Sequence, residues 1–245
     1  MGKRAALTLA LMLMCSLRAP AATPTAGINI NLFTGSYQGS QQQSASLPVV
    51  PVPALTVKVP VEQFALYVED VPPIGPVSYG NGFGGTQSTK LSYFASQLAW
   101  HTPNNRIEAG AGTTLINQIT YYNSFINNQS SRVAGFRFSI RARLEASPRN
   151  TTDLTIALSP SMHGVQNTEF ATRCGGIACL PATRDAEVAS LADVTAQRTQ
   201  THGNFALLYG IRYLNYVAHF SANGHPADHD IALMLFAGFA IGLGR

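Results

Sequence analysis

The chain has 245 residues, of which 46% are hydrophobic and only 11% are charged. Because an average soluble domain carries about 25% charged residues, this composition argues against a disordered chain, a nucleic-acid-binding protein and an ordinary soluble enzyme with a charged surface. Beyond the N-terminus, the longest apolar run is Ile231–Gly244, which is shorter than the roughly 20 residues that a membrane-spanning helix needs.

Residues 1–22 have the layout of a cleaved secretory signal peptide. A basic start is followed by an apolar run over residues 5–14 and by small residues before the cleavage point. Cleavage removes Lys3, Arg4 and Arg18 from the sixteen basic residues and leaves thirteen against twelve acidic ones, a net charge of +1. We therefore expect no nucleic acid or other polyanion as a partner.

Residues 23–54 are rich in proline, glutamine and serine, a composition typical of an extended, poorly ordered segment. We expect them to form a periplasmic lead-in to the folded domain. A short apolar alternation at Ile28, Ile30 and Leu32 leaves an additional strand open.

From residue 55 onward, apolar residues recur at every second position. In residues 134–146 all seven residues of one parity are apolar, whereas the other parity carries Arg137, Arg141 and Arg143. Such strict alternation is typical of a strand with one apolar face, and at roughly 3.3 Å per residue the segment can cross a bilayer. The same pattern predicts seven more strands, of which the last three named are weaker: 107–121, 154–162, 205–219, 231–243, 62–70, 89–101 and 187–200.

The connections between these segments alternate in length. Short connections lie near 102–105, 147–152 and 201–204, and longer ones lie near 71–88, 122–131, 164–186 and 220–230. Short turns at one end, long loops at the other and an even strand number are typical of bacterial outer-membrane barrels. We therefore expect residues 55–245 to form an all-β, closed antiparallel transmembrane β-barrel of eight strands, or of ten if the N-terminal segment contributes, with the short turns in the periplasm.

Over about residues 55–245, this pattern resembles the small outer-membrane barrels of the OmpA and OmpX kind. The resemblance implies location in the outer membrane and contact with outer-membrane lipid and lipopolysaccharide, and we expect any extracellular ligand to bind through the four long loops. The chain departs from these barrels at its end, because Ile241–Arg245 lacks the terminal aromatic residue that they usually carry. The alternative fold is a soluble, secreted β-sandwich.

When such a sheet closes into a barrel, the polar residues at alternate positions of its strands face the lumen. The lumen of an eight-stranded barrel is just wide enough for side chains to fill. The residues expected there are Arg137, Arg141, Arg143 and Arg212, with Glu108, Glu145 and Asp153 as counter-charges. Because buried charges need partners, we interpret them as a structural network that plugs the lumen. A narrow anion-preferring pore is the alternative in a barrel of ten or more strands, since basic rings favour anions.

After cleavage two cysteines remain, Cys174 and Cys179, in the longest expected external loop. Oxidising compartments permit disulfides, and the intervening glycines let the chain turn, so we expect these two cysteines to form a disulfide. A metal-binding pair is the competing interpretation, but no histidine lies close in sequence, and we expect no metal and no cofactor.

A short polar motif follows the strand expected at 205–219. Residues 219–224, His-Phe-Ser-Ala-Asn-Gly, resemble the His-x-Ser-Asn-Ala-Gly motif of the lipid A deacylases, which are eight-stranded barrels. The resemblance implies that Ser221 is the nucleophile and that His219 is the general base that activates it. The alanine and asparagine are swapped, and the nearest carboxylates, Asp228 and Asp230, lie away from the position of the orienting acid.

We therefore expect an outer-membrane protein with a structural or surface-interaction role, and we favour a non-enzymatic one. Hydrolysis of an acyl ester of lipopolysaccharide by Ser221 and His219 is the first alternative, and the narrow anion pore is the second.

Overall fold

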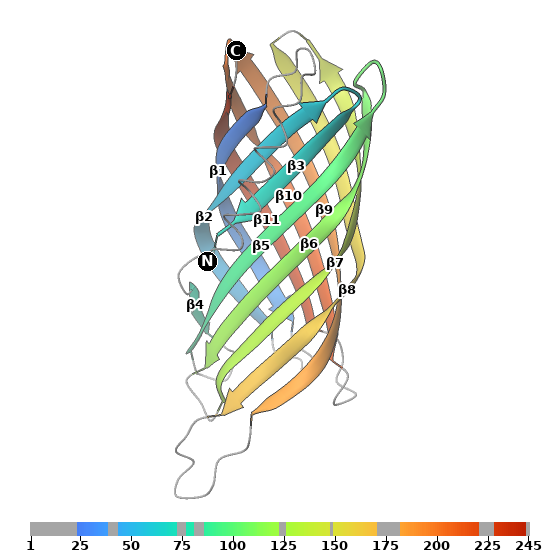
Figure 1. The fold of residues 1–245 in the computed structure, drawn as a ribbon. Coiled ribbons are helices and arrows are strands. Elements are labelled where there is room, and N and C mark those ends of the chain that lie inside the picture. Colours follow the sequence, from blue (N-terminus) through green and yellow to red (C-terminus); the bar gives the residue numbers. More distant parts are fainter. Residues whose placement is uncertain are drawn as a thin grey trace, which may run out of the picture.

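The computed structural model describes residues 24–38, 44–72, 77–80, 86–122, 126–147, 149–170, 182–220 and 228–243. Eleven β-strands account for most of them (Figure 1). Among these residues, no helix has the length and apolarity needed to span a membrane. In chain order the strands are β1 Thr25–Gln38, β2 Ser44–Val61, β3 Phe64–Val71, β4 Val77–Gly80, β5 Thr86–His101, β6 Ile107–Tyr122, β7 Ile126–Ala146, β8 Asn150–Phe170, β9 Thr183–His202, β10 Phe205–Phe220 and β11 Asp228–Gly242.

The strands form one antiparallel sheet that closes on itself (Figure 1). Consecutive strands pair from β1 to β3 and from β5 to β11, and β1 pairs with β11 along its whole length. Pairing of β3 with β5 closes the wall with ten strands, while the short β4 pairs with Thr86–Thr89 of β5 beyond the end of β3. The predicted all-β, closed antiparallel barrel is confirmed, with the larger of the two strand numbers that the sequence allows.

The barrel begins at Thr25, which corrects the lead-in expected at residues 23–54. β1 alternates exposed apolar residues with buried asparagines, and β2 continues the wall. Prolines hide β2 from the sequence pattern because proline lacks the N–H of a ladder hydrogen bond. β3 pairs with Leu55–Val61 of β2, so Pro51 and Pro53 lie beyond this pairing and have their ladder partner in β1. Such edge-like positions tolerate proline.

A band of exposed apolar side chains runs around the half of the barrel nearest the short turns. On β7 it contains Phe136, Phe138, Ile140 and Leu144, and Phe136 is 73% exposed. Other members are Ile28, Ile30 and Leu32 on β1, Leu55 and Val61 on β2, Phe64 on β3, Leu98 and Trp100 on β5, Ile107 on β6, Ile156 and Leu158 on β8, Leu207 and Ile211 on β10, and Leu235 and Phe239 on β11. We call this the apolar band, and it matches the lipid-facing surface of outer-membrane barrels.

The wall continues beyond the apolar band toward the long connections. β7 and β8 are each 21 residues long, whereas about 9–11 residues cross the hydrocarbon core. Their far ends are polar, with Asn128–Arg132 on β7 and Gln166–Glu169 on β8. We call this polar part of the wall the outer extension. Because of it, strand residues occupy part of each of the four segments expected to be long loops.

Strand β8 contains a β-bulge at Pro160. Its register with β7 passes from Leu158 to Met162, and its register with β9 passes from Ser159 to Met162. The bulge inverts the alternation: odd-numbered residues up to Ser159 face the lumen, and even-numbered ones do so from Met162 onward. Proline within strands is confined to edges and bulges, which accounts for its presence in the middle of this one.

Apolar side chains pack inside the lumen beside the bulge. Val133 and Met162 have no exposed surface, and Tyr93, Ile116 and Leu191 belong to the same cluster. We call this group the apolar lumen cluster, and its smaller members are Val52, Ala54, Val71, Ala95, Ala189 and Ala218.

The apolar band predicts the effect of a charge placed within it. Ile140→Arg should lower the free energy of unfolding by about 2–4 kcal/mol, because the side chain faces hydrocarbon. Asn128→Arg, on the outer extension of the same strand, can contact Glu169, to which Asn128 donates at 2.7 Å, and should cost less than about 1 kcal/mol. Urea unfolding in lipid vesicles, followed by Trp100 fluorescence, measures both. Equal costs would contradict the assignment of the band.

Candidate functional site

The central buried charges lie in the middle of the lumen. Asp193 on β9 accepts a hydrogen bond from Arg137 on β7 at 2.7 Å and two from Arg212 on β10 at 2.8 and 3.0 Å. All three side chains point inward in the alternation of their strands and are buried. Two guanidinium groups therefore share one carboxylate, and the bidentate contact fixes the plane of the Arg212 guanidinium.

Arg212 also reaches across the lumen. Its Nη1 donates to Oε1 of Glu69 on β3 at 2.5 Å, although β2, β1 and β11 separate β10 from β3 in the wall. The guanidinium carbon lies 5.2 Å from the centre of the Tyr93 ring on β5, a cation–π distance. We call Glu69, Arg137, Asp193 and Arg212 the central quartet.

A second charged cluster lies closer to the short turns. Arg141 on β7 donates to the Tyr67 hydroxyl at 2.9 Å and to Oε2 of Glu108 at 3.2 Å, and the Tyr67 hydroxyl donates to the same oxygen at 2.6 Å. Lys58 lies 3.8 Å from Glu108 and 5.0 Å from the centre of the Tyr67 ring. These contacts join β2, β3, β6 and β7 inside the lumen.

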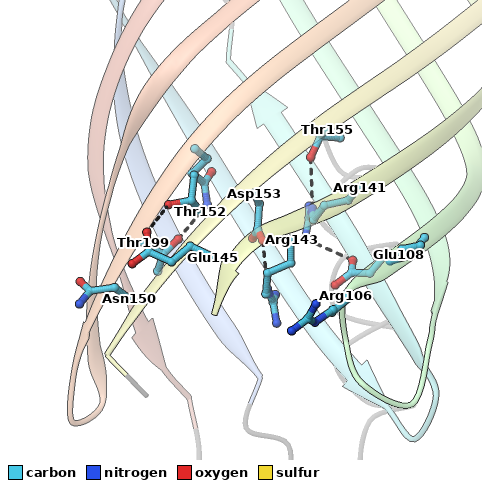
Figure 2. A network of polar contacts seen from close by, with 12 residues as sticks. Arg106, Glu108, Arg141, Arg143, Glu145, Asn150, Thr152, Asp153, Thr155 and Thr199 are labelled. Carbon is cyan, nitrogen blue, oxygen red and sulfur yellow. Dashed lines mark hydrogen bonds and ion pairs between the residues drawn. The ribbon is translucent and has the colours of Figure 1, made fainter. Parts of the chain in front are cut away.

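A third contact joins β7 to β8 at the same end (Figure 2). Nε of Arg143 lies 3.0 Å from Oδ1 of Asp153, and Nε of Arg141 donates to Thr155 at 3.2 Å. The structure thus places six of the residues expected in the lumen there, each in contact with an opposite charge: Arg137, Arg141, Arg143, Arg212, Glu108 and Asp153.

Glu145 is the exception, because it lies on the outer face of the wall. It accepts a hydrogen bond from Thr152 at 3.1 Å and pairs with Arg198 at 3.3 Å, and its side chain is 48% exposed (Figure 2). A register shift after Arg143 breaks the alternation of β7, so that Arg143 pairs with inward Asp153 and Glu145 with outward Thr152. This bulge corrects the expectation that Glu145 faces the lumen.

A cavity of about 490 Å³ occupies the lumen between the central quartet and the short turns. Its uncharged lining is rich in threonine, asparagine and glutamine. Taken together, the three groups of contacts contain five cations (Lys58, Arg137, Arg141, Arg143 and Arg212) and four carboxylates (Glu69, Glu108, Asp153 and Asp193). Polar and charged side chains therefore face the cavity beside apolar ones, and the charges around it nearly cancel.

The sequence pattern did not point to Tyr67, Glu69 or Asp193. They lie in the segments 62–70 and 187–200, where the alternation is weakest. Apolar residues such as Leu191 also face the lumen there and reduce the contrast between the two faces. The signal in the sequence is the need of each buried arginine for a carboxylate. Once Glu145 is outside, Glu108 and Asp153 are too few for four inward arginines, so the weaker segments have to supply further carboxylates.

Several predictions fall on residues outside the described part of the chain: the signal peptide at residues 1–22, the Cys174–Cys179 disulfide and the nucleophile Ser221. His219 is described, and it lies exposed on the outer face of β10, opposite Val188. The signal peptide, the disulfide and the ester hydrolase site stay predictions. Within the described ranges, no three His, Cys, Asp or Glu residues gather in a way that could hold a metal ion.

Similarity to known proteins is structural. No family model matches the chain, and no curated protein matches it in sequence. The outer-membrane protease OmpT of Escherichia coli has a TM-score of 0.61 at 9% identity, covering 94% of this chain and 100% of that one. Weaker matches are the translocator domain of the autotransporter NalP from Neisseria meningitidis (TM-score 0.47, 7% identity, 98% and 96% covered) and Neisserial surface protein A (0.40, 10%, 92% and 100%). The chain has the fold of outer-membrane β-barrels, as the strand pattern indicated.

Replacing Asp193 tests whether the central quartet stabilises the barrel. Asp193→Asn keeps the size of the side chain but removes the charge that Arg137 and Arg212 share, and it should lower the free energy of unfolding by about 3–5 kcal/mol. Glu145→Gln removes the exposed contact with Arg198 and should cost less than about 1 kcal/mol. Urea titration in detergent micelles, read by heat-modifiable gel migration, measures both. Similar values would show that the quartet contributes little.

Proposed function

We propose that the protein resides in the outer membrane as a barrel with a sealed lumen. Its role is then structural support and contact with partners through the outer extension and the connections beyond it. The observation that carries the proposal is the contact of Arg212 with both Glu69 and Asp193, which spans the lumen from β3 to the neighbouring strands β9 and β10.

Two consecutive layers support a sealed lumen. The charged contacts form the layer nearer the short turns, and the apolar lumen cluster lies beside them on the side of the long connections. A hydrated ion would have to separate guanidinium and carboxylate groups that are buried, and each separation leaves an uncompensated charge in the interior. It would then meet the closely packed Val133 and Met162.

The balance of charge argues against the anion-preferring pore. Anion selectivity requires a ring of basic groups whose field reaches the passing ion. Here five cations face four carboxylates at contact distance, so most of the positive potential is cancelled where an anion would need it. A cavity on the short-turn side of these contacts can hold water without conducting.

The outer extension supports the surface-interaction role. A wall that only crossed the bilayer would end near the apolar band, whereas β7 and β8 continue with polar side chains on both faces. Long, paired strands fix the points at which the connections of this end start and finish. We propose that the segments 71–88, 122–131, 164–186 and 220–230 carry the contacts with an extracellular ligand, while the apolar band contacts lipid and lipopolysaccharide.

Conductance separates the sealed barrel from the pore. The wild-type protein should produce no current steps in a planar bilayer, whereas the variant Arg212→Ala/Asp193→Ala/Met162→Ala, which removes material from both layers, should conduct. The variant Glu145→Ala/Arg198→Ala loses an exposed ion pair on the outer face and should remain silent. Heat-modifiable migration reports that each protein is folded. Anion-selective current steps from the wild-type protein would contradict the sealed barrel and support the anion-preferring pore.

Thiol labelling of intact cells tests the orientation. Asn128→Cys lies on the outer extension, and Arg149→Cys lies in the exposed turn between β7 and β8. Both variants are made in a Cys174→Ser/Cys179→Ser background, which alone is the blank, because these two cysteines lie in an expected external segment. A membrane-impermeant maleimide should label the first variant on whole cells and the second only after the outer membrane is permeabilised. The reverse order of labelling would place the short turns outside, and equal labelling before permeabilisation would contradict residence in the outer membrane.

A further inference from the structure

A serine and a histidine are hydrogen-bonded to each other on the outer face of β8. The Ser161 hydroxyl oxygen lies 2.9 Å from Nε2 of His163, and both residues are exposed. In the tautomer protonated at Nδ1, Nε2 accepts the proton of the Ser161 hydroxyl. This is the contact that joins a nucleophile to its general base.

The β-bulge of β8 creates this pair. Odd-numbered residues of β8 face the lumen up to Ser159, so an unbroken strand would bury Ser161 in the lumen. The register skips Pro160 and Ser161 on both neighbouring strands, and Ser161 emerges on the same outer face as His163. Bulges are frequent next to active sites because they redirect a side chain.

The pair lies at the loop-side edge of the apolar band. His163 is paired with Ala134 on β7 and Val188 on β9. The outward residues toward the short turns are apolar and exposed, among them Phe136 and Leu158. One step in the opposite direction, Arg132 is exposed on β7 at the start of the outer extension. In the orientation proposed above, on which this inference rests, this level corresponds to the headgroups of the outer leaflet, where ester bonds of membrane lipids lie.

We propose that Ser161 and His163 form a site that hydrolyses an acyl ester of an outer-leaflet lipid. Nε2 of His163 takes the proton of the Ser161 hydroxyl as its oxygen attacks the ester carbonyl, and the protonated histidine returns that proton to the departing alcohol. Water then attacks the acyl–Ser161 ester, with His163 again as the base, and releases the fatty acid. Arg132 can hold a phosphate of the lipid, since arginine binds phosphate with two parallel hydrogen bonds.

This site is separate from the motif at His219 and Ser221. His219 lies on β10, and Val188 of β9 stands between it and His163 in the same row of the wall. The two serines are also 60 positions apart in the chain, so substitutions tell the sites apart. The site faces away from the lumen, and its activity does not depend on whether the barrel conducts.

A serine-directed probe tests the proposal on the full-length protein folded in detergent. A fluorophosphonate should label the wild type, with the adduct on Ser161 by peptide mass spectrometry, and Ser161→Ala should lose the label. Ester hydrolysis is measured as fatty acid released from two kinds of vesicle, one of phosphatidylethanolamine alone and one that also contains lipopolysaccharide, which distinguishes a phospholipid from a glycolipid source. His163→Ala should lower the rate by at least about 100-fold, the contribution of a general base.

Control variants distinguish loss of activity at this site from loss of folding and from activity of the motif at His219 and Ser221. Ser130→Ala, on the outer extension of β7, should leave labelling and hydrolysis unchanged, and heat-modifiable migration confirms that each variant is folded. Folded wild-type protein that neither reacts with the probe nor releases fatty acid from either vesicle overturns the proposal. Labelling that persists in Ser161→Ala, or that Ser221→Ala abolishes in its place, overturns it as well.

Discussion

Backbone groups inside a bilayer have no water to bind, so a sheet that crosses it must have no free edge. In this chain the requirement is met at two seams, where β1 pairs with β11 and where β3 pairs with β5. The second seam is shorter, because β3 has 8 residues and β5 has 16, and β4 pairs with Thr86–Thr89 of β5 beyond the end of β3. Closure with ten strands encloses a lumen wider than the eight-stranded one that side chains just fill. Long charged side chains such as Arg212 are needed to reach across it.

The alternation of apolar and polar residues was sufficient to predict the fold class and most of the wall. It succeeds where one face meets lipid and the other carries arginines, as on β7, because the two environments select opposite side chains. It fails on β2, where prolines interrupt the pattern at positions outside the β3 pairing. It also fails at the end of β7, because the bulge after Arg143 turns Glu145 outward and the strand ends at Ala146, too soon for the change in alternation to show in the sequence.

The network inside the lumen could be predicted in part. The alternation of residues along each strand predicts that the arginines point inward. It does not predict their carboxylate partners, because these depend on which strands face one another across the barrel. Glu69 and Arg212 are 143 positions apart, and nothing local in either segment points to the other. Ser161 was hidden for a related reason, since unbroken parity assigns it to the lumen.

The reach of Arg212 to Glu69 also bears on how the barrel is assembled. Strands β3 and β10 approach across the interior only when the sheet curls and its first and last strands meet, so this ion pair cannot form in an open sheet. Until then the guanidinium and the carboxylate are exposed on one side of a curved ribbon, where contact with lipid tails is costly. The ion pair between Arg212 and Glu69 therefore needs the closed wall, and it stabilises the closed barrel relative to an open sheet.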